Sequence, residues 1–332
     1  MKAAQLKDHG SVENFQIVDI PKPTFGPDDV LIKVHFAGLR WGDIMNRYGI
    51  PVRSAKVPFI PGQEATGVVA EVGKNVTRLK VGDRVVTQPN GGAYAEYLCM
   101  PAAGVNLVPE HVPLETALVY SVNLPTAYML VYEWAKVQEG ESVLVHAAAG
   151  GVGSLVIQIL KRKFKNVKTI GLGGTDEKVK AILANGSDHA INYKKNDYVT
   201  EVEKIVGAKS RTFAPLAPPA GVHVVLNGVG GKALQTDRLV IRPLGRWVLF
   251  GVTSGMEPIN VYANSYDSIT IMPFSILAFL STPAMRRAQS FTSDWLKLER
   301  LIAPTIHPIE DIAKVQRAME IGETQGKIVF SL

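Results

Sequence analysis

The stretch Ser142-Val-Leu-Val-His-Ala-Ala-Ala-Gly-Gly-Val-Gly153 decides the fold of this 332-residue chain. Residues 142–146 predict a buried strand, and residues 152–163 have the apolar spacing of a helix. The segment between them matches the dinucleotide pattern G-x-G-x-x-G, with Ala148 at the first glycine position and Gly150 and Gly153 at the other two. The stretch therefore predicts the strand, turn and helix that open a dinucleotide-binding fold.

A loop of this kind suits a pyrophosphate for physical reasons. A glycine at 150 lets the backbone approach the phosphates, a glycine at 153 lets the helix pack closely on the strand, and the helix amino terminus favours negative charge. The alternative is a tight turn that binds nothing, but the strand–helix–strand context favours a cofactor. The predicted contacts are the loop residues Ala148, Gly150, Gly151, Val152 and Gly153.

Beyond this stretch, strands and helices continue to alternate. The sequence predicts a helix over 176–185 and further strands, which lie at 167–172, 190–193, 222–227 and 246–251. This order predicts an α/β fold with a parallel, doubly wound sheet. Segment 209–221 contains Pro215, Pro218 and Pro219 and is predicted to be a loop.

The first third of the chain has a different pattern. Short strands set between Gly, Pro and Asn predict a small barrel or a partly open sheet, and they lie at 30–36, 67–72, 84–87 and 94–99. Helices are predicted around 283–301 and 309–321, in residues that we expect to fold back onto the first domain. We therefore expect a β-rich domain at 1–122, a dinucleotide-binding domain at 123–273 and a return to the first domain at 274–332.

Composition excludes several other classes of protein. Apolar residues make up 46% and charged residues 20% of the chain, as in ordinary globular proteins. The one cysteine, Cys99, cannot form an intrachain disulfide or supply a multi-cysteine zinc site. The amino terminus has no apolar signal core, and the apolar run 269–280 is too short to span a membrane. We expect a soluble, cytoplasmic protein whose net charge of +6 favours anionic partners.

The residues after the second predicted strand bear on which dinucleotide binds. An acidic residue about 20 positions beyond the glycine loop would bind the adenosine ribose of NAD, but that count reaches Gly173. The missing carboxylate leaves room for the 2′-phosphate of NADPH, with Thr175 and Lys178 as predicted contacts and Tyr193 stacking nearby. The acidic pair after Thr175 argues mildly against this, although such residues are ordinary at a helix start. The alternative for Lys178 is a solvated surface lysine with no ligand. From the missing carboxylate we predict NADPH and not NADH as the cofactor.

Short motifs in a fixed order extend over nearly the whole chain. They are Gly82-Asp-Arg-Val85, Gly92-Ala-Tyr-Ala-Glu-Tyr97, Val143 to Gly153, Ile191-Asn-Tyr193, Arg242-Pro-Leu-Gly245, Phe250-Gly251 and Gly326-Lys-Ile-Val329. Together they resemble the medium-chain dehydrogenase/reductase superfamily, in its zinc-independent quinone oxidoreductase branch. Within that branch, Asn123-Leu-Pro-Thr-Ala-Tyr-Met129 and Asn196-Asp-Tyr-Val199 resemble the synaptic vesicle amine transport protein-like subfamily.

The resemblance implies a GroES-like catalytic domain interrupted by a Rossmann domain. It also implies a homodimer in which a late strand, at 268–272, pairs across the two-fold axis; the alternative is an ordinary internal strand. The nicotinamide is expected in a cleft between the domains. Its implied surroundings are Asn123 and Thr126 at the mouth of the cleft, and Asn227, Phe250 and Gly251 beside the cofactor.

A catalytic zinc can be tested against the same resemblance. Metal-dependent relatives have a cysteine shortly after the Ala-Gly at 37–38 and a Gly-His-Glu motif further on. This chain has Arg40 or Trp41 at the first place and Gly62-Gln-Glu64 at the second. Glu64 alone cannot hold a catalytic zinc, which usually needs three protein ligands. We expect no metal, and hydride transfer from NADPH to a quinone or an α,β-unsaturated carbonyl, which are already electrophilic.

Arg40 replaces an asparagine that quinone oxidoreductases often carry. A guanidinium facing the cleft polarises a carbonyl or binds an anionic substrate, and the alternative is an ion pair with Asp43 or Glu64. The proton donor stays open, because solvent can protonate an enolate or a hydroquinone and tyrosines are more often packed aromatics. The candidate donors are Tyr48, Tyr94 and Tyr128, and the catalytic candidates are Arg40, Tyr48 and Asn123.

Other functions remain beside the quinone or enone reductase. One is an enoyl-thioester reductase in lipid or polyketide synthesis. Another is a non-catalytic NADPH-binding protein on a membrane or lipid, since the subfamily includes membrane-associated proteins. The basic charge and the apolar stretch 272–280 are compatible with peripheral contact with an anionic membrane, although the charge is not clustered. No motif supports a nucleic-acid partner.

Overall fold

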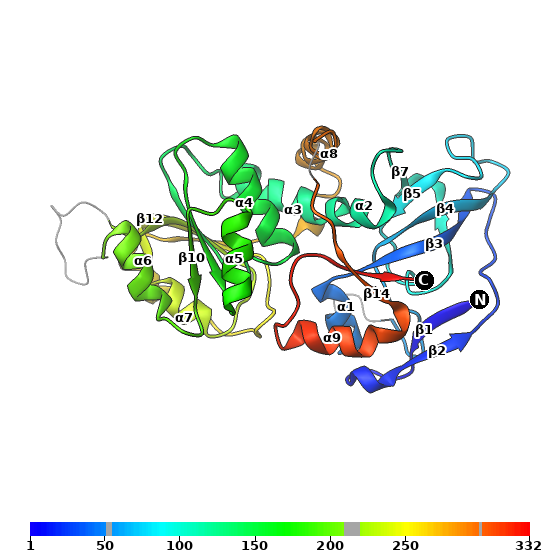
Figure 1. The fold of residues 1–332 in the computed structure, drawn as a ribbon, viewed down its shortest axis with the longest axis horizontal. Coiled ribbons are helices and arrows are strands. Elements are labelled where there is room, and N and C mark those ends of the chain that lie inside the picture. The colour runs from blue at the N-terminus through cyan, green and yellow to red at the C-terminus, as the bar shows by residue number, and fades with distance from the viewer. Residues whose placement is uncertain (51–54, 209–219, 299–300) are drawn as a thin grey trace. The chain divides into compact units, whose positions relative to one another are not determined.

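The computed structural model describes residues 1–50, 55–208, 220–298 and 301–332, and it divides into two compact units (Figure 1). Unit 1 comprises Met1–Val122 and Leu296–Leu332, and unit 2 comprises Asn123–Trp295. The sequence predicts the second boundary between residues 273 and 274, whereas unit 2 ends at Trp295. Unit 2 extends further because helix α8 (Pro283–Trp295) packs against helix α3 (Asn123–Tyr128). Residues 209–219 of the predicted proline-rich loop lie outside the described residues.

Unit 1 is built around a seven-stranded sheet in the order β14-β15-β3-β4-β5-β7, with β6 also pairing with β3. Its central strand, β3 (Asp29–Leu39), buries most of its apolar side chains, including Val34 and the consecutive residues 30–32. The other strands are β4 (Ala65–Val72), β5 (Arg84–Thr87), β6 (Tyr97–Pro101), β7 (Val105–Leu107), β14 (Thr305–Pro308) and β15 (Ile328–Ser331). The predicted strand at 94–99 thus begins later, at Tyr97, and β1 (Lys2–Leu6) and β2 (Phe15–Asp19) form a separate antiparallel pair.

The C-terminal residues complete the sheet of unit 1. Strand β15 pairs antiparallel with β3, and this register places Val329 opposite Gly38. Lys327, which precedes β15, therefore reaches the end of β3 from the far end of the chain. The helices and turns of this unit are α1 (Trp41–Arg47), α2 (Leu114–Ser121), α9 (Ile312–Glu320), η1 (Val12–Asn14), η2 (Ala102–Gly104) and η6 (Ile309–Asp311).

Unit 2 contains a six-stranded sheet in the order β10-β9-β8-β11-β12-β13. Every neighbouring pair is parallel, which agrees with the predicted doubly wound Rossmann sheet. The strands are β8 (Ser142–Val145), β9 (Lys168–Gly173), β10 (His189–Asn192), β11 (Val222–Asn227), β12 (Ile241–Leu249) and β13 (Thr270–Pro273). The chain reverses its direction of progress between β8 and β11, and ligands of such sheets bind at the carboxyl ends of the strands at this point.

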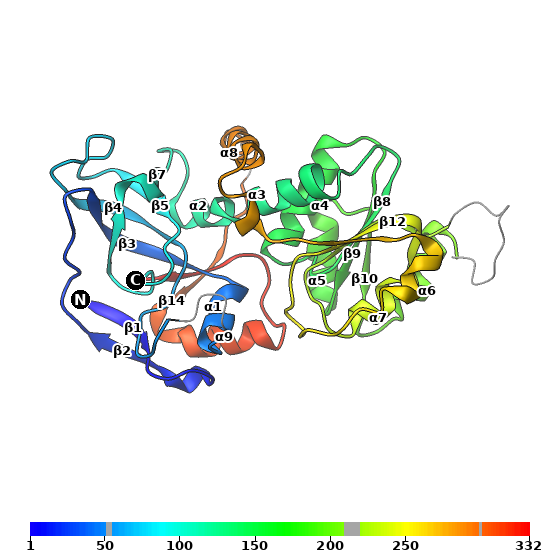
Figure 2. The ribbon, with the colours of Figure 1, turned by 180° about the vertical axis from the view of Figure 1, so that it is seen from behind.

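Helices alternate with the strands of unit 2. Helix α4 contacts β9, and α5 contacts β9 and β10, so the two cover one face of the sheet (Figure 1). Figure 2 shows the same sheet from the opposite side. The elements between strands are α4 (Gly151–Lys163), α5 (Asp176–Ala184), α6 (Tyr198–Val206), α7 (Ala233–Asp237) and η4 (Tyr262–Asp267), with η3 (Met129–Trp134) before the sheet and η5 (Ile276–Phe279) after it.

The predicted late strand is β13, and it lies at the edge of the sheet, where it pairs with β12. Among the described residues, no helix is long and apolar enough to cross a membrane.

Candidate functional site

The glycine-rich loop lies at the carboxyl end of β8, held by backbone hydrogen bonds to both neighbouring strands. The His146 N–H donates to Leu226 O (3.0 Å), and the Ala148 N–H donates to Leu172 O (3.3 Å). Gly150 is the N-cap of α4 and has no side chain to bond the first turn of that helix. The amino end of a 13-residue helix is therefore left uncapped beside the loop, as a bound phosphate requires.

The two predicted glycine positions have different amounts of space. A Cβ on Gly153 would overlap the Ala147 carbonyl oxygen and lie 2.8 Å from Ala148 Cα. A Cβ on Gly150 would lie 3.1 Å from the Ala147 carbonyl oxygen. Gly153 therefore permits the close approach of helix and loop, while Gly150 keeps the outer side of the loop bare. This cradle fits a pyrophosphate.

The residues predicted to contact a 2′-phosphate lie together at the carboxyl ends of β9 and β10. The Tyr193 N–H donates to Gly173 O (3.1 Å), and a Cβ on Gly173 would lie 3.1 Å from Lys178 Cβ. Thr175 is the N-cap of α5, and its hydroxyl accepts from the Lys178 N–H (3.2 Å). Lys194 is a further lysine near this group that was not predicted. Burial and the charge of Lys194 lower the pKa of Lys178. A Cβ on Gly174 would lie 3.4 Å from Lys194 Cε, so both lysines flank the carboxyl end of β9.

The acidic residue that argued against NADPH has other partners. The Asp176 carboxylate accepts from Asn192 Nδ2 (2.7 Å) and pairs with Lys195 Nζ (2.5 Å). Hydrogen bonds from these two side chains lower the pKa of Asp176. Its charge is thereby balanced at the surface of unit 2.

Asn227, Phe250 and Gly251 also lie together, at the carboxyl ends of β11 and β12. The Phe250 N–H donates to Asn227 O (2.9 Å), and a Cβ on Gly251 would overlap the backbone of Gly228. The side chain of Asn227 shapes the next loop, because its Oδ1 accepts from the N–H groups of Val229 and Gly230, each at 2.8 Å. Asn123 and Thr126 are buried on α3, which packs against α4.

In unit 1, Arg40 contacts the residues that replace the metal-binding motif. Its Nη2 donates to Gln63 Oε1, and its Nε lies 3.4 Å from Glu64 Oε1. The ion pair with Glu64 that the sequence analysis weighed is therefore present, yet 24% of the Arg40 side chain is exposed. Arg40 is both anchored and accessible.

Lys327 is a charged partner of this cluster that the sequence analysis missed. Its Nζ forms an ion pair with Glu64 Oε2, and both side chains are almost fully buried. A Cβ on Gly38 would overlap the Glu64 carboxylate and lie 3.0 Å from Lys327 Nζ, so this pair lies directly over the end of β3. No sequence signal pairs two residues so far apart in the chain, although Lys327 belongs to a motif that carried the resemblance.

Asp43 is a buried carboxyl group beside the same cluster. Its Oδ2 accepts from the Arg40 N–H (2.9 Å), and its side chain is inaccessible to solvent. Burial raises its pKa to about 6, although the charge of Arg40 opposes the shift. Tyr94 is also fully buried; burial and the neighbouring Asp43 raise the pKa of its hydroxyl, which lies 3.4 Å from Gly38 O.

The two remaining candidate proton donors have their own carboxylate partners. The Tyr48 hydroxyl donates to Glu320 Oε1 (2.6 Å), and its ring packs over the Arg47 guanidinium, 4.3 Å away. The Tyr128 hydroxyl donates to Glu133 Oε1 (3.3 Å). These contacts support a structural role for both tyrosines, and Tyr48 as a catalytic residue stays a prediction.

Within the described parts of the chain, no group of three or more His, Cys, Asp and Glu side chains could hold a metal ion. The donor set around Glu64 also opposes a divalent cation. Both oxygens of this carboxylate already face cations, Arg40 and Lys327. A zinc ion there would be repelled by two positive charges, so the residues present do not fit it.

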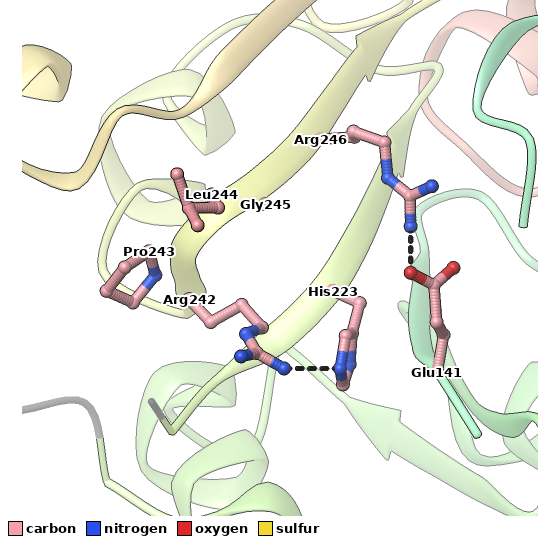
Figure 3. A pocket seen from close by; sticks show the side chains of 7 residues that line it. All are labelled: Glu141, His223, Arg242, Pro243, Leu244, Gly245 and Arg246. Atoms are coloured by element: carbon pink, nitrogen blue, oxygen red, sulfur yellow. Dashed lines mark hydrogen bonds and ion pairs between the residues drawn. The ribbon is translucent and has the colours of Figure 1, made fainter. Parts of the chain in front are cut away.

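A cavity of about 380 Å³ lies at the amino ends of the inner strands of the unit 2 sheet, and its lining side chains are drawn in Figure 3. Its lining residues lie at the amino ends of β11 and β12 and just before β8, which is the end of these strands opposite the glycine loop. Arg246 pairs with Glu141 across it, and Arg242 contacts the His223 ring. Burial and the charge of Arg242 lower the pKa of His223. This cavity is not part of the candidate cofactor site.

Comparison with known proteins places these features in context. The Alcohol dehydrogenase GroES-like domain model matches residues 26–110, and the Zinc-binding dehydrogenase model matches residues 151–290. The human synaptic vesicle membrane protein VAT-1 homolog is 34% identical over 328 residues, which cover 93% of this chain and 80% of that protein. The probable quinone oxidoreductase of Schizosaccharomyces pombe is 37% identical over 335 residues, covering 98% and 95% of the two chains. A mycobacterial protein solved in complex with NADPH has a TM-score of 0.88 at 28% identity, covering 100% of both chains.

Proposed function

Because the chain belongs to the quinone oxidoreductase-like proteins of the medium-chain dehydrogenase/reductase superfamily, close to the VAT-1 homologues, we propose that it is an NADPH-dependent oxidoreductase that reduces a quinone or an α,β-unsaturated carbonyl without a catalytic metal. The observation that carries the proposal is the uncapped glycine cradle at the start of α4, with Lys178 near Lys194 beyond the next strand. A structural neighbour that binds NADPH supports the same cofactor.

The cofactor is held by two kinds of contact in this proposal. The backbone N–H groups at the start of α4 face the pyrophosphate, and Gly150 leaves room for it. The lysines at 178 and 194 bind the 2′-phosphate, whose negative charge relieves their mutual repulsion. Asp176 does not oppose this phosphate strongly, because Lys195 balances its charge. When bound, NADPH supplies the hydride.

Arg40 is the group that we assign to the electron acceptor. Its guanidinium stabilises the negative charge that develops on the acceptor oxygen during hydride transfer. Gln63 and Glu64 hold the guanidinium in one orientation, and the exposed quarter of the side chain reaches the substrate. The proton then comes from solvent in our proposal, because Tyr48, Tyr94 and Tyr128 each contact other polar groups of the protein.

We propose a metal-free mechanism, and the charges around Glu64 support it. The family's metal-dependent members need the place that Gln63 and Glu64 occupy here. In this chain a lysine and an arginine approach the only carboxylate of that motif. Arg40 therefore provides the positive charge that a metal would otherwise provide. Activity that survives dialysis against a chelator, with no metal in the purified protein, is the expected result.

Activity is tested by following the oxidation of NADPH with a panel of quinones, enones and enoyl thioesters. We expect turnover with quinones or enones; turnover confined to enoyl thioesters would favour the alternative enoyl reductase. Gly150→Asp places a charge at the pyrophosphate and should abolish NADPH binding, while Gly104→Asp, the same exchange at an exposed glycine of unit 1, is the matched control. Unchanged affinity in the Gly150 variant would refute the cofactor site.

A second candidate function is peripheral binding to an anionic membrane. The curated human relative is named a vesicle membrane protein. Leu277 and Leu280 are exposed, on η5 and just after it, and the chain has a net charge of +6. Sedimentation with anionic liposomes at low and high salt tests it, with neutral liposomes as the control. No sedimentation with either lipid would leave the reductase as the function.

We also propose a homodimer. Strand β13 lies at the edge of its sheet and pairs with β12 along one side, which leaves its other edge available to a second copy. Analytical ultracentrifugation should give twice the mass of one chain. Ile271→Pro, which removes a backbone donor from β13, should shift the mass toward the monomer, and a dimer of unchanged affinity would refute this interface.

A further inference from the structure

Unit 2 contains one buried carboxylate whose role the proposed function does not explain. Asp237 ends the short helix α7, and its side chain is inaccessible to solvent. It lies near the carboxyl ends of β8, β11 and β12, where it contacts side chains from β11, from β12 and from the residue after β8. A buried carboxylate is costly unless its oxygens accept hydrogen bonds, so its partners indicate what it does.

Four side chains donate to this carboxylate. Oδ1 accepts from His146 Nε2 (2.7 Å) and the Tyr198 hydroxyl (2.9 Å). Oδ2 accepts from Asn227 Nδ2 (2.6 Å) and Trp247 Nε1 (3.1 Å). A carboxylate offers about four acceptor positions, so every one is used here. Burial and the charge of Asp237 raise the pKa of the Tyr198 hydroxyl, which keeps it a donor.

Two of these donors begin the loops at the candidate cofactor site. His146 is the first residue after β8, directly before the glycine-rich loop. Asn227 is the last residue of β11, and the same side chain that donates to Asp237 accepts from the N–H groups of Val229 and Gly230. The carboxylate is thus one hydrogen bond from the start of the first loop and two from the backbone of the second.

We propose that Asp237 is the positioning residue of the dinucleotide site, and that its carboxylate fixes the backbone of the loops after His146 and Asn227 in the arrangement that binds the cofactor. The inference rests on the proposed NADPH binding but adds a residue that does not touch the cofactor. Because Asp237 acts on the backbone and not on the 2′-phosphate contacts, its loss weakens NADPH and NADH by the same factor.

The direct test is Asp237→Asn, which keeps the shape of the side chain. The exchange removes the negative charge that all four donors share, and its amide group reverses the direction of the hydrogen bonds on one side, so the contact with at least one loop is weakened. We expect the dissociation constants of NADPH and NADH to rise together, by about tenfold or more. Asp188→Asn is the matched control. Asp188 also accepts two hydrogen bonds in unit 2, from the N–H and the hydroxyl of Thr169, but it lies at the amino ends of β9 and β10, away from the glycine loop. The control should change both constants by less than about twofold.

A second pair of variants decides the question if Asp237→Asn does not fold. His146→Leu and Tyr198→Phe each remove one donor to the same carboxylate oxygen. His146 leads into a cofactor loop, whereas Tyr198 lies on helix α6. Weaker binding of both dinucleotides is expected for His146→Leu alone. Equal effects of the two variants, or a loss confined to NADPH, would overturn the proposal.

Amide hydrogen exchange separates this inference from the proposed function. In the cofactor-free protein, His146→Leu should speed exchange in the 147–151 loop, and Tyr198→Phe should leave it unchanged. Faster exchange in His146→Leu, together with a wild-type protein that binds neither dinucleotide, would support the anchor and reject the proposed cofactor. Unchanged exchange in both loops of Asp237→Asn, with unchanged binding, would reject the anchor alone.

Discussion

Exchanging glycine for alanine at two positions of one loop should separate stability from cofactor binding. Gly153→Ala places a methyl group 2.8 Å from Ala148 Cα and into the Ala147 carbonyl oxygen, both of which are backbone atoms. Gly150→Ala places the same group 3.1 Å from that oxygen, with a backbone φ of −82° that alanine readily adopts. The chemical change is identical, but only the first variant overlaps backbone atoms, whereas the second makes one tight contact that a shift of a few tenths of an ångström relieves.

The expected magnitudes follow from these clearances. An ordinary carbon–carbon contact needs roughly 3.4 Å or more, so helix α4 must move by about 0.6 Å or more in Gly153→Ala. Overpacking of this kind costs about 1–3 kcal/mol in the free energy of unfolding. The same shift moves the helix amino terminus away from the loop, so NADPH affinity falls as well. Gly150→Ala should cost less than about 0.5 kcal/mol of stability, yet its methyl group faces the pyrophosphate and should weaken NADPH about tenfold.

Urea unfolding gives the stability, and isothermal titration calorimetry gives the NADPH dissociation constant. Gly104→Ala is the control, since this exposed glycine is not in the left-handed region and its added Cβ would lie 3.5 Å from Met100 Cε, an ordinary contact. A Gly153→Ala protein as stable as the wild type would refute the close approach of helix and loop. Wild-type NADPH affinity in Gly150→Ala would refute the cradle.

The remaining predictions concern charges. Lys178→Ala should weaken NADPH much more than NADH in a titration of both; an equal effect would remove this lysine from the 2′-phosphate site. Asp43 has a pKa of about 6 in the folded protein, against an ordinary value of 3.8. Between these two values the folded state binds more protons than the unfolded state. The free energy of unfolding should therefore fall by up to about 3 kcal/mol as pH rises from about 4 to about 6. Asp43→Asn should flatten that part of the stability–pH curve measured by urea unfolding, and a curve of unchanged slope would contradict the assignment. Lys327→Met leaves the Glu64 carboxylate buried without its lysine and should cost about 3–5 kcal/mol, whereas adding Glu64→Gln should restore much of the loss. Purely additive losses in the double variant would contradict a coupled pair.

The fold could be predicted because its signals are local. Periodic apolar residues and the glycines at 150 and 153 mark strand, turn and helix within one short stretch, and the α4 and β11 predictions agree with the structure to within a residue. The end of unit 2 could not be predicted in this way. Helix α8 looks the same in sequence whichever unit it packs on, and only its contact with α3 decides.

The residues of the candidate sites likewise divide into those that local spacing predicts and those that depend on long-range contacts. Loop residues such as Gly173 and Lys178 could be predicted to lie together because their spacing from the glycine motif is fixed by the strand–helix–strand unit, and their contact with a cofactor stays a prediction. The anchors were missed because they depend on contacts across the chain. Asp237 meets His146 from 91 residues away, and Lys327 meets Glu64 from 263 residues away. The signal available was the motif Gly326-Lys-Ile-Val329, which marked the place of the lysine but not its partner.

The charged groups around Arg40 in unit 1 leave its positive charge only partly compensated. Lys327 and Glu64 form a buried pair whose charges cancel, so Glu64 does not fully neutralise the arginine that lies 3.4 Å away. Asp43 is then the second anion near Arg40, and it is protonated below its pKa of about 6. The cluster is therefore most positive below about pH 6 and loses one positive charge as Asp43 ionises above it. An anionic acceptor, or the developing oxyanion of a quinone or enone, should bind more tightly on the acidic side of this value, because Arg40 is then the uncompensated charge of the cluster.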